Sequence, residues 1–448
     1  MNRTALEEIF GAALRRVDPV RMMTECVRLE GDTLIVTAGD REERLDLTRF
    51  DQIQVVGAGK AGARMAAGLE QVLGVRIGGG LVSVKYGHTE QLDRIELIEA
   101  GHPVPDEQSV TAARSIAQIA DRADERTLVI VLISGGGSAL LTLPYEDNQR
   151  TLTLDEIQAT TQLLLECGAP IQEINTVRKH LSGISGGRFC ARLRPATSLS
   201  LILSDVVGDS LENIASGLTS PDPATFADAL AIAERYGITE RLPEQVRSLL
   251  TDGAAGRVTD TPGPDDPSFE RVRSVLIGTN ALALEAARER AVELGYNTVC
   301  LSSQITGEAS EIARFYGGIA REAVRGPMLA QKPCCILAGG ETTVTIRGTG
   351  TGGRNQELAL AFLREIEDAP EAFAGVSFLS GATDGNDGPT DAAGAFASRE
   401  VLERARRAGL SIRETLAHND SYHFFERTGD LLKTGPTNTN VCDVQVVL

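Results

Sequence analysis

The chain has 448 residues, of which 42% are hydrophobic and 4% aromatic, and a formal net charge of -18. That charge opposes sequence-independent attraction to a nucleic-acid backbone, and seven cysteines without a CxxC pair provide neither a disulfide framework nor zinc-ligand spacing. The longest apolar run, 128–133, is too short to cross a bilayer, so we expect a cytoplasmic protein with no nucleic-acid or membrane partner.

The first half of the sequence alternates short apolar strands with amphipathic helices, after a helix over 4–23 and a hairpin over 33–47. The predicted strands are 52–56, 80–84, 127–133 and 198–204, and the predicted helices are 60–73, 106–122, 154–167, 173–181 and 225–236. This alternation is typical of a parallel sheet covered on both faces, with ligand sites at the carboxyl ends of its strands.

A stretch rich in Asp, Gly, Pro and Thr covers 251–267 and lacks the pattern of regular structure. The second half then predicts helices over 281–294, 308–324 and from Arg354, strands over 274–277, 298–301, 334–337, 376–379 and near Val444, and a hairpin over 342–347. We therefore predict two α/β domains. Residues 1–250 form a Rossmann-like domain with a mostly parallel sheet, and residues 251–448 form the second domain.

A glycine-rich turn with the spacing GxGxxG, Gly57-Ala-Gly59-Lys60-Ala-Gly62, follows a predicted strand and opens a helix. A dinucleotide site would place an acid at the end of the next strand, but that strand ends at Lys85. Lys60 inside the turn also suits neutralisation of a phosphoryl group. We favour a phosphate-type site here, and the alternatives are a nicotinamide dinucleotide site and a packing turn.

A second strand–glycine–helix junction reads Ser134-Gly135-Gly136-Gly137-Ser138 and carries a hydroxyl at each end. It lacks the GxxxxGK[ST] pattern of a P-loop. Such a junction forms a cradle for phosphate or carboxylate, or a tight turn between packed elements.

Several charged residues lie where chemistry is expected. Lys179, on a predicted basic helix segment, belongs either to a solvated face or to a ligand site. Asp205 and Asp209 directly follow a strand, and Asp384 and Asp387 lie in a glycine turn after another strand. Carboxylates at such positions hold Mg²⁺, accept a hydroxyl proton, or cap turns.

A glycine-rich loop at 348–353 is followed by Arg354, which opens a helix. We expect the glycines to bring backbone N–H groups close to a ligand, and the helix start and the planar fork of Arg354 to bind carboxylate or phosphate. The polar residues that flank the loop are Glu341, Thr342, Asn355 and Gln356.

Long motifs in the same order give the chain a resemblance to the type II glycerate kinase family, the glycerate 2-kinases with an N-terminal glycerate kinase region and a C-terminal MOFRL domain. These motifs are 55–61, 132–138, 175–180, 203–209, 339–343, 352–358, 380–389 and 433–441. The resemblance implies phosphorylation of the 2-hydroxyl of D-glycerate with ATP and Mg²⁺, in a cleft between the two domains. It matches the family's essential lysine and arginine to Lys60 and Arg354.

With that resemblance, Lys60 is expected to neutralise charge on the moving phosphoryl group, and Arg354 to clamp the glycerate carboxylate or a phosphate. Mg²⁺ is expected on the nucleotide and one or two of the four aspartates. Further contacts are expected from Gly57, Gly59, Ser134 to Ser138, Lys179, Glu341, Thr342, Asn355 and Gln356.

Two positions depart from the family pattern: many members carry lysine where Ser185 stands, and glycine is common where Asn438 stands. Two other functions stay open, a hydroxypyruvate reductase that uses NAD(P)H and a noncatalytic sugar-acid or nucleotide-binding protein. D-glycerate and ATP are the expected partners, and a homodimer is also considered.

Overall fold

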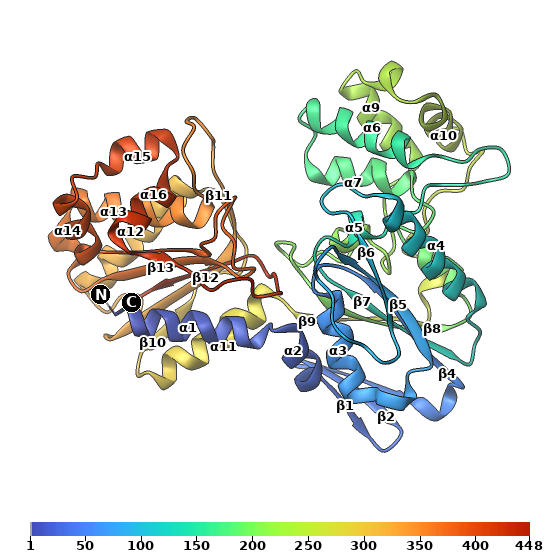
Figure 1. The fold of residues 1–448 in the computed structure, drawn as a ribbon, viewed down its shortest axis with the longest axis horizontal. Helices are drawn as coiled ribbons and strands as arrows, with labels where there is room; N and C mark the ends of the chain where they lie inside the picture. The colour runs from blue at the N-terminus through green and yellow to red at the C-terminus, as the bar shows by residue number, and fades with distance from the viewer. Residues whose placement is uncertain (1) are drawn as a thin grey trace. The chain divides into compact units, whose positions relative to one another are not determined.

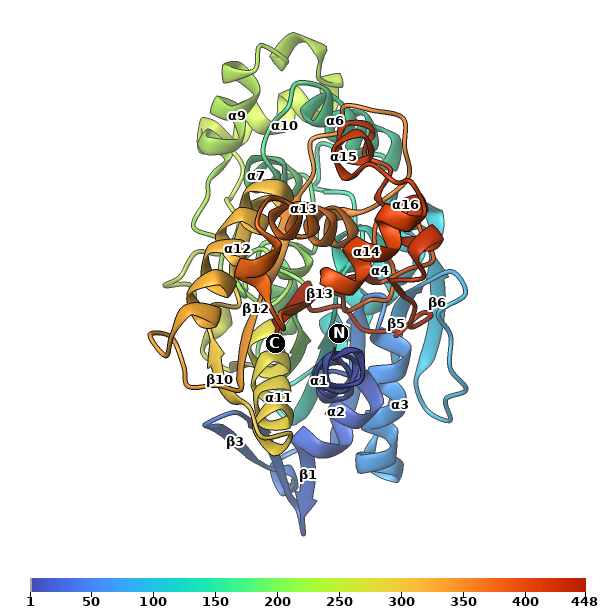
Figure 2. The ribbon, with the colours of Figure 1, turned by 90° about the vertical axis from the view of Figure 1, so that its left-hand side faces the viewer.

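The computed structural model describes residues 2–448, which form two compact α/β units (Figures 1 and 2). One unit is Pro19–Ile277, and the other joins the segment up to Asp18 with Gly278–Leu448. The predicted class, two α/β domains of which the first has a parallel sheet, is confirmed. In the described part of the chain, no helix is long and apolar enough to span a membrane.

The two units divide the chain at other positions than the predicted domains, 1–250 and 251–448 (Met1 itself lies outside the described residues). The helix predicted over 4–23 is two helices, α1 (Arg3–Arg16) and α2 (Pro19–Cys26). Helix α1 packs in the second unit beside α11 (Asn280–Glu293) (Figure 2). A proline is favoured at the first position of a helix, which explains the new start at Pro19.

The other end of the first unit also differs from the prediction. The helix α10 (Glu244–Ala254) runs into the stretch predicted to be irregular, and β9 (Val272–Gly278) joins the sheet of the first unit beside β8 (Thr197–Leu203). Strand pairing is a tertiary contact, so local composition did not reveal that β9 belongs to the first unit.

The main sheet of the first unit has the strand order β6-β5-β4-β7-β8-β9. Its other strands are β4 (Gln52–Ala58), β5 (Gly79–Lys85), β6 (Glu96–Ala100), β7 (Thr127–Ile133) and β8 (Thr197–Leu203). The pairs among β4 to β8 are parallel, and every residue of β7 is buried because both faces of the sheet are covered. This is the doubly wound order. The strands are added towards one edge of the sheet up to β6 and towards the other edge from β7 onwards, and in such sheets a ligand crevice forms at the carboxyl ends of the two central strands, here β4 and β7.

Some helices of the first unit cover this sheet, and others form a separate group at one end of the unit (Figure 1). They are α3 (Gly62–Leu73), α4 (Glu107–Arg122), α5 (Gly137–Leu140), α6 (Leu154–Glu166), α7 (Ile171–His180), α8 (Arg188–Leu193) and α9 (Phe226–Arg235), besides α2 and α10. A small antiparallel sheet contains β1 (Val27–Glu30), β2 (Thr33–Ala38) and β3 (Arg41–Asp46). The separate group, α6, α7, α9 and α10, has its own apolar core around Phe226.

The second unit has a mixed sheet in the order β10-β12-β16-β13-β14-β15, with β11 paired to the far end of β12. The strands are β10 (Asn297–Cys300), β11 (Ile305–Glu308), β12 (Cys334–Thr343), β13 (Ser377–Ala382), β14 (Gly394–Ser398), β15 (Leu431–Leu432) and β16 (Asp443–Val447). The hairpin predicted over 342–347 is wrong. The end of β12 pairs in parallel with β11, which lies earlier in the chain, so a turn within 342–347 is not needed.

Helices cover both faces of the second sheet (Figure 1). They are α11 (Asn280–Glu293), α12 (Ala309–Arg325), α13 (Arg354–Asp368), α14 (Arg399–Arg407), α15 (Ile412–His418) and α16 (Ser421–Thr428), besides α1. Phe362 of α13 stacks on Phe378 of β13 with ring centroids 4.3 Å apart, and α13 is buried along most of its length. This packing fixes the start of α13, and therefore the position of Arg354.

Candidate active site

The two glycine turns of the first unit meet at the carboxyl ends of β4 and β7. The Lys60 N–H donates to the Gly135 carbonyl at 2.9 Å, and the Ala61 N–H donates to Ser134 Oγ at 3.1 Å. A Cβ at Gly59 would lie 2.0 Å from Ser134 Oγ, so only glycine allows this approach. The structure therefore brings Lys60 and the Ser134 loop together.

Gly57 has a different position from the one expected of a ligand contact. It lies inside β4, where a Cβ would come within 2.2 Å of the Leu132 carbonyl oxygen. Gly57 therefore permits the close packing of β4 on β7, and the prediction that it contacts a ligand finds no support in this position.

The loop after β8 reaches the same place. Asp205 packs on Gly135, where a Cβ would lie 2.1 Å from Asp205 Oδ2. Ser138 Oγ accepts a hydrogen bond of 2.7 Å from Ser216 Oγ, and a Cβ at Gly137 would lie 2.8 Å from the Ala215 methyl group. The loops after three neighbouring strands thus converge around the glycine junction.

Lys179 does not belong to this group. Its ammonium forms an ion pair of 3.3 Å with Asp222, and both side chains are almost fully buried. Thr261 donates a hydrogen bond to the other oxygen of Asp222 at 3.1 Å. Lys179 therefore forms an internal ion pair and does not lie on a solvated face, whereas its contact with a ligand stays a prediction.

Two histidines that the sequence motifs do not include lie beside Lys60. A Cβ at Gly136 would lie 2.8 Å from Cδ2 and Nε2 of His102 and 3.5 Å from Cε of Lys60. His88 Nδ1–H donates to the Lys60 carbonyl at 3.2 Å. Burial, together with the charges of Lys60 and Lys85 and the nearby His88, lowers the pKa of His102 to about 4. His102 is therefore a neutral imidazole at pH 7.

The position of His102 depends on β6, a strand that the sequence pattern did not predict. The segment 96–100 is short and two of its five residues are charged, so it lacks the apolar run of its neighbours. The signal that could have found it is the pair Gly101-His102, a glycine and a polar side chain after a short segment that contains Leu97 and Ile98.

Arg354 in the second unit is held by two carboxylates. Its Nε and one terminal nitrogen contact the two oxygens of Asp443 at 2.6 and 3.0 Å, and its other terminal nitrogen contacts Glu341 at 2.8 Å. Burial alone would lower the pKa of Arg354, but Asp443, Glu341 and Asp387 together raise it above its ordinary value. The guanidinium is thus a fixed cation, and only its remaining terminal N–H donors are available to an anion.

The start of α13 is closed by a side chain of the protein itself. Asp387 is 1% exposed and accepts hydrogen bonds from the backbone N–H groups of Asn355 at 3.0 Å and Gln356 at 2.8 Å. Burial raises the pKa of Asp387 to about 6. Asp387 therefore caps the helix and occupies two of the N–H groups at its start. Its role as a Mg²⁺ ligand stays a prediction.

The side chains of Asn355 and Gln356 also point into the protein. Asn355 Oδ1 accepts a 2.5 Å hydrogen bond from Ser380 Oγ, and Gln356 Nε2 donates to Thr390 Oγ1 at 2.9 Å. Both residues are fully buried and hold the start of α13 in place, and their contact with a substrate stays a prediction.

The glycine-rich loop 348–353 packs on a turn of the same unit. The N–H groups of Arg347 and Gly348 donate to Asn419 Oδ1 at 2.7 and 3.0 Å, and the Thr351 N–H donates to Asp420 Oδ1 at 2.9 Å. The glycines of this loop are not among the residues with positive φ. They permit close packing against the chain, and the expected ligand cradle stays a prediction.

Two further predicted residues lie on β12. Glu341 is exposed and paired with Arg354, whereas Thr342 is 4% exposed. Thr342 Oγ1 is buried and has no hydrogen-bond partner among residues 2–448. Burial at this position makes Thr342 a core residue.

The predicted metal ligands do not form a preformed metal cage. Residues 2–448 contain no group of three or more His, Cys, Asp or Glu side chains that could hold a metal ion. Asp384 accepts from the Asn386 N–H at 3.0 Å, and burial raises the pKa of Asp209, opposed by a hydrogen bond from Ser204. Asp205 alone packs on the glycine junction. This donor set fits Mg²⁺, which takes most of its ligands from phosphate and water and one or two from carboxylates.

The two positions that depart from the family pattern have the following surroundings. Asn438 has φ of 58°, a left-handed conformation that asparagine tolerates almost as well as glycine. Ser185 is 8% exposed and forms a 3.0 Å hydrogen bond with Ser182 Oγ.

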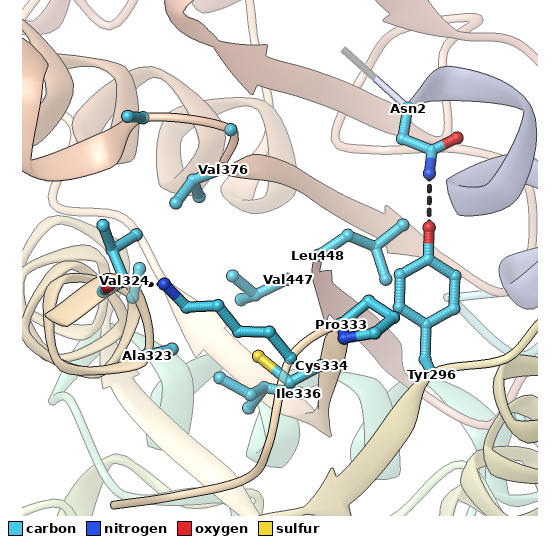
Figure 3. A pocket seen from close by; sticks show the side chains of 14 residues that line it. Asn2, Tyr296, Ala323, Val324, Pro333, Cys334, Ile336, Val376, Val447 and Leu448 are labelled. Atoms are coloured by element: carbon cyan, nitrogen blue, oxygen red, sulfur yellow. Dashed lines mark hydrogen bonds between the residues drawn. The ribbon is translucent and has the colours of Figure 1, made fainter. Parts of the chain in front are cut away.

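A cavity of about 330 Å³ in the second unit lies apart from these residues (Figure 3). It is lined by Cys334 at the start of β12 and Val447 at the end of β16, whereas Glu341 and Asp443 lie at the opposite ends of these strands. The Asn2 amide donates to the Tyr296 hydroxyl at its rim. The cavity contains none of the predicted site residues.

The parallel, doubly wound sheet of the first unit and the mixed sheet of the second define a two-domain α/β protein. Residues 5–251 match the family described as "Domain of unknown function (DUF4147)", and residues 334–443 match the MOFRL family. The chain belongs to the glycerate 2-kinase family.

The similarity to known proteins extends over almost the whole chain. The chain is 40% identical to the glycerate 2-kinase of Pyrococcus horikoshii over 98% of its length and 96% of that protein. It is 43% identical to a putative hydroxypyruvate reductase of Agrobacterium vitis, over 100% of its length and 94% of that protein. The crystal structure of a glycerate kinase from Thermotoga maritima matches with a TM-score of 0.87 and 38% identity, covering 100% of this chain and 99% of that one.

Proposed function

We propose that the protein is a glycerate 2-kinase, which transfers the γ-phosphoryl group of ATP to the 2-hydroxyl of D-glycerate and forms 2-phosphoglycerate. One observation carries the proposal: Lys60 lies at the glycine junction of β4 and β7 in a chain that is 40% identical to a glycerate 2-kinase over nearly its full length. The doubly wound order supports it, because ligands of such sheets bind where these two strands end.

Phosphoryl transfer requires alignment of the two reactants and neutralisation of charge on the moving group. The Lys60 backbone is fixed by the Gly135 carbonyl, and its ammonium is compact enough to approach phosphate oxygens between the glycine turns. We assign to Lys60 the neutralisation of the γ-phosphoryl charge.

ATP and Mg²⁺ are part of the proposal, and when bound Mg²⁺ neutralises phosphate charge and orients the nucleotide. Asp205 is the carboxylate that we assign to it, because Asp205 packs directly on Gly135 of the phosphate cradle. Asp387 is assigned to the helix cap instead, because it is buried and accepts from two backbone N–H groups.

We assign to Arg354 the recognition of a substrate anion, either the glycerate carboxylate or a phosphate. Asp443 and Glu341 hold the plane of the guanidinium and leave its remaining N–H donors in one orientation. This pre-organisation reduces the entropy lost when an anion binds. Both Lys60 and Arg354 are needed for turnover in this proposal.

A hydroxypyruvate reductase is the second candidate function, because one relative carries that name. The reaction requires a nicotinamide dinucleotide, whose ribose is normally bound by an acid at the end of the second strand of the sheet. Here β5 ends at Lys85, so that anchor is missing.

The seven cysteines of the chain are free thiols, which supports a reducing, cytoplasmic setting for the kinase.

The test is product identification with purified protein. One reaction contains D-glycerate, ATP and MgCl₂, and a parallel reaction contains hydroxypyruvate with NADH or NADPH. Phosphorus NMR and mass spectrometry should identify 2-phosphoglycerate in the first reaction, and the Lys60→Met variant should form little of it. Formation of 3-phosphoglycerate, oxidation of NAD(P)H alone, or ligand binding without turnover would each overturn the proposal.

A further inference from the structure

We propose, building on the proposed kinase function, that His102 is a further catalytic residue: its imidazole accepts the hydrogen bond of the glycerate 2-hydroxyl and takes the proton of that group during phosphoryl transfer. His102 belongs to none of the sequence motifs, and it enters the site only through the tertiary structure. Its position, its free ring nitrogens and the charges around it carry the proposal.

The position of His102 places it on the same glycine as Lys60. A Cβ at Gly136 would lie 2.8 Å from His102 Nε2 and 3.5 Å from Lys60 Cε, so both side chains lie over one face of the phosphate cradle. If Lys60 contacts the γ-phosphoryl group, a hydroxyl that attacks the phosphorus lies within reach of a group beside Lys60. His102 is such a group.

The ring nitrogens of His102 are available for a substrate. His102 has no hydrogen-bond partner in the structure described for residues 2–448, and its ring is only half-buried. His88, by contrast, is committed, because its Nδ1–H donates to the Lys60 carbonyl. Of the two histidines beside Lys60, His102 is the one whose Nε2 edge lies against Gly136 of the glycine junction, so it is the one we assign to the hydroxyl proton.

The charges around His102 determine its protonation. Lys60 from the β4–α3 turn and Lys85 and His88 from the end of β5 face it, and with burial they keep the ring neutral at pH 7. The acid next in sequence, Asp106, is engaged by the Tyr86 hydroxyl at 2.8 Å and by the Ser109 N–H. Bound phosphate and carboxylate would offset the lysine charges, so the basicity of His102 should rise when the substrates are present.

The step balances without another reactant. The oxygen of the 2-hydroxyl forms a bond to the γ-phosphorus while its O–H bond breaks and the proton passes to a ring nitrogen of His102. The bond between the γ-phosphorus and the bridging oxygen breaks, and its electron pair leaves with ADP. The neighbouring lysine charges disfavour the imidazolium, so it returns the proton to water once the anionic products leave.

The nearby carboxylates are less suited to this role. Asp205 packs under Gly135 and is assigned to Mg²⁺. Asp209 has φ of 55° and is held by Ser204, and burial raises its pKa. A neutral imidazole also approaches an anionic phosphoryl group without the repulsion that a carboxylate would experience.

The test compares His102→Gln with the wild-type enzyme and with a control variant, His423→Gln, which changes an exposed histidine of the second unit. We expect kcat for 2-phosphoglycerate formation to fall by a factor on the order of 100 in His102→Gln, with both KM values within about threefold. The control should keep the wild-type kcat. The wild-type kcat should fall at acidic pH as a single proton binds, and that dependence should be absent from His102→Gln.

Histidine NMR of the wild-type protein gives a second readout that does not depend on turnover or on the folding of a variant. The sequence contains five histidines, and one ring should stay neutral well below pH 6 and increase its pKa when ADP and MgCl₂ are added. A wild-type protein that forms no 2-phosphoglycerate would reject the kinase proposal. Three outcomes would reject only the role of His102, provided that the wild type is a kinase. They are an unchanged kcat in His102→Gln, a change in KM alone, and histidine pKa values that stay the same when ADP and MgCl₂ are added.

Discussion

Replacing Gly136 by alanine changes the candidate site by a single methyl group. Gly136 has φ of 84°, and its Cβ would lie 2.8 Å from the ring edge of His102. The neighbour is a ring beside Lys60, so the methyl group can be accommodated only if His102 or the glycine junction moves. We expect Gly136→Ala to fold and to lose most of its kinase activity.

The expected magnitude has two parts. Alanine in a left-handed conformation costs about 1–2 kcal/mol of stability, which corresponds to a decrease in Tm of about 2–4 °C per kcal/mol for a unit of this size. A displacement of catalytic groups by about 1 Å lowers kcat by a factor on the order of 100. Thermal unfolding and steady-state formation of 2-phosphoglycerate measure the two parts separately.

Gly168 provides a matched control. It has φ of 74°, and a Cβ there would meet no atom within 4 Å. Gly168→Ala should therefore show the same loss of stability and keep the wild-type kcat. Equal kcat values for Gly136→Ala and Gly168→Ala would refute the reasoning, because the crowding of His102 and Lys60 would then have no effect on the reaction.

Three further predictions test other parts of the molecule. Lys60→Met should lower kcat by a factor on the order of 100 or more with little change in Tm; a near-normal kcat would remove Lys60 from the mechanism. Asp443→Ala leaves Arg354 without its buried partner and should destabilise the second unit by about 3–5 kcal/mol in calorimetry, and an unchanged unfolding transition would contradict the ion pair. Burial, with Glu308 nearby, raises the pKa of Glu357 to about 7 from 4.5, so its stabilising contribution is complete below pH 4.5 and is lost as the pH rises through 7. Glu357→Gln should therefore match the wild type near pH 5 and exceed its stability at pH 8 in urea unfolding, whereas a constant difference would disprove the shift.

Local sequence patterns specify the strands and the glycine junction of the first unit. The fully apolar β7 and the alternation around it predicted a parallel sheet, and the carboxyl ends of neighbouring parallel strands must lie at one edge. These patterns are therefore sufficient to place Lys60 and Ser134 at the same edge of the sheet. Each of these features depends on a pattern within one short segment.

The residues that surround the predicted cations are set by the folding of distant segments onto one another. Arg354 binds Asp443, which lies 89 residues further along the chain, and the start of α13 is capped by Asp387. His102 reaches Gly136 because β6 and β7 belong to the same sheet. Periodicity and turn chemistry act between neighbours in the sequence, whereas buried ion pairs, caps and sheet membership join segments that meet only when the chain is folded.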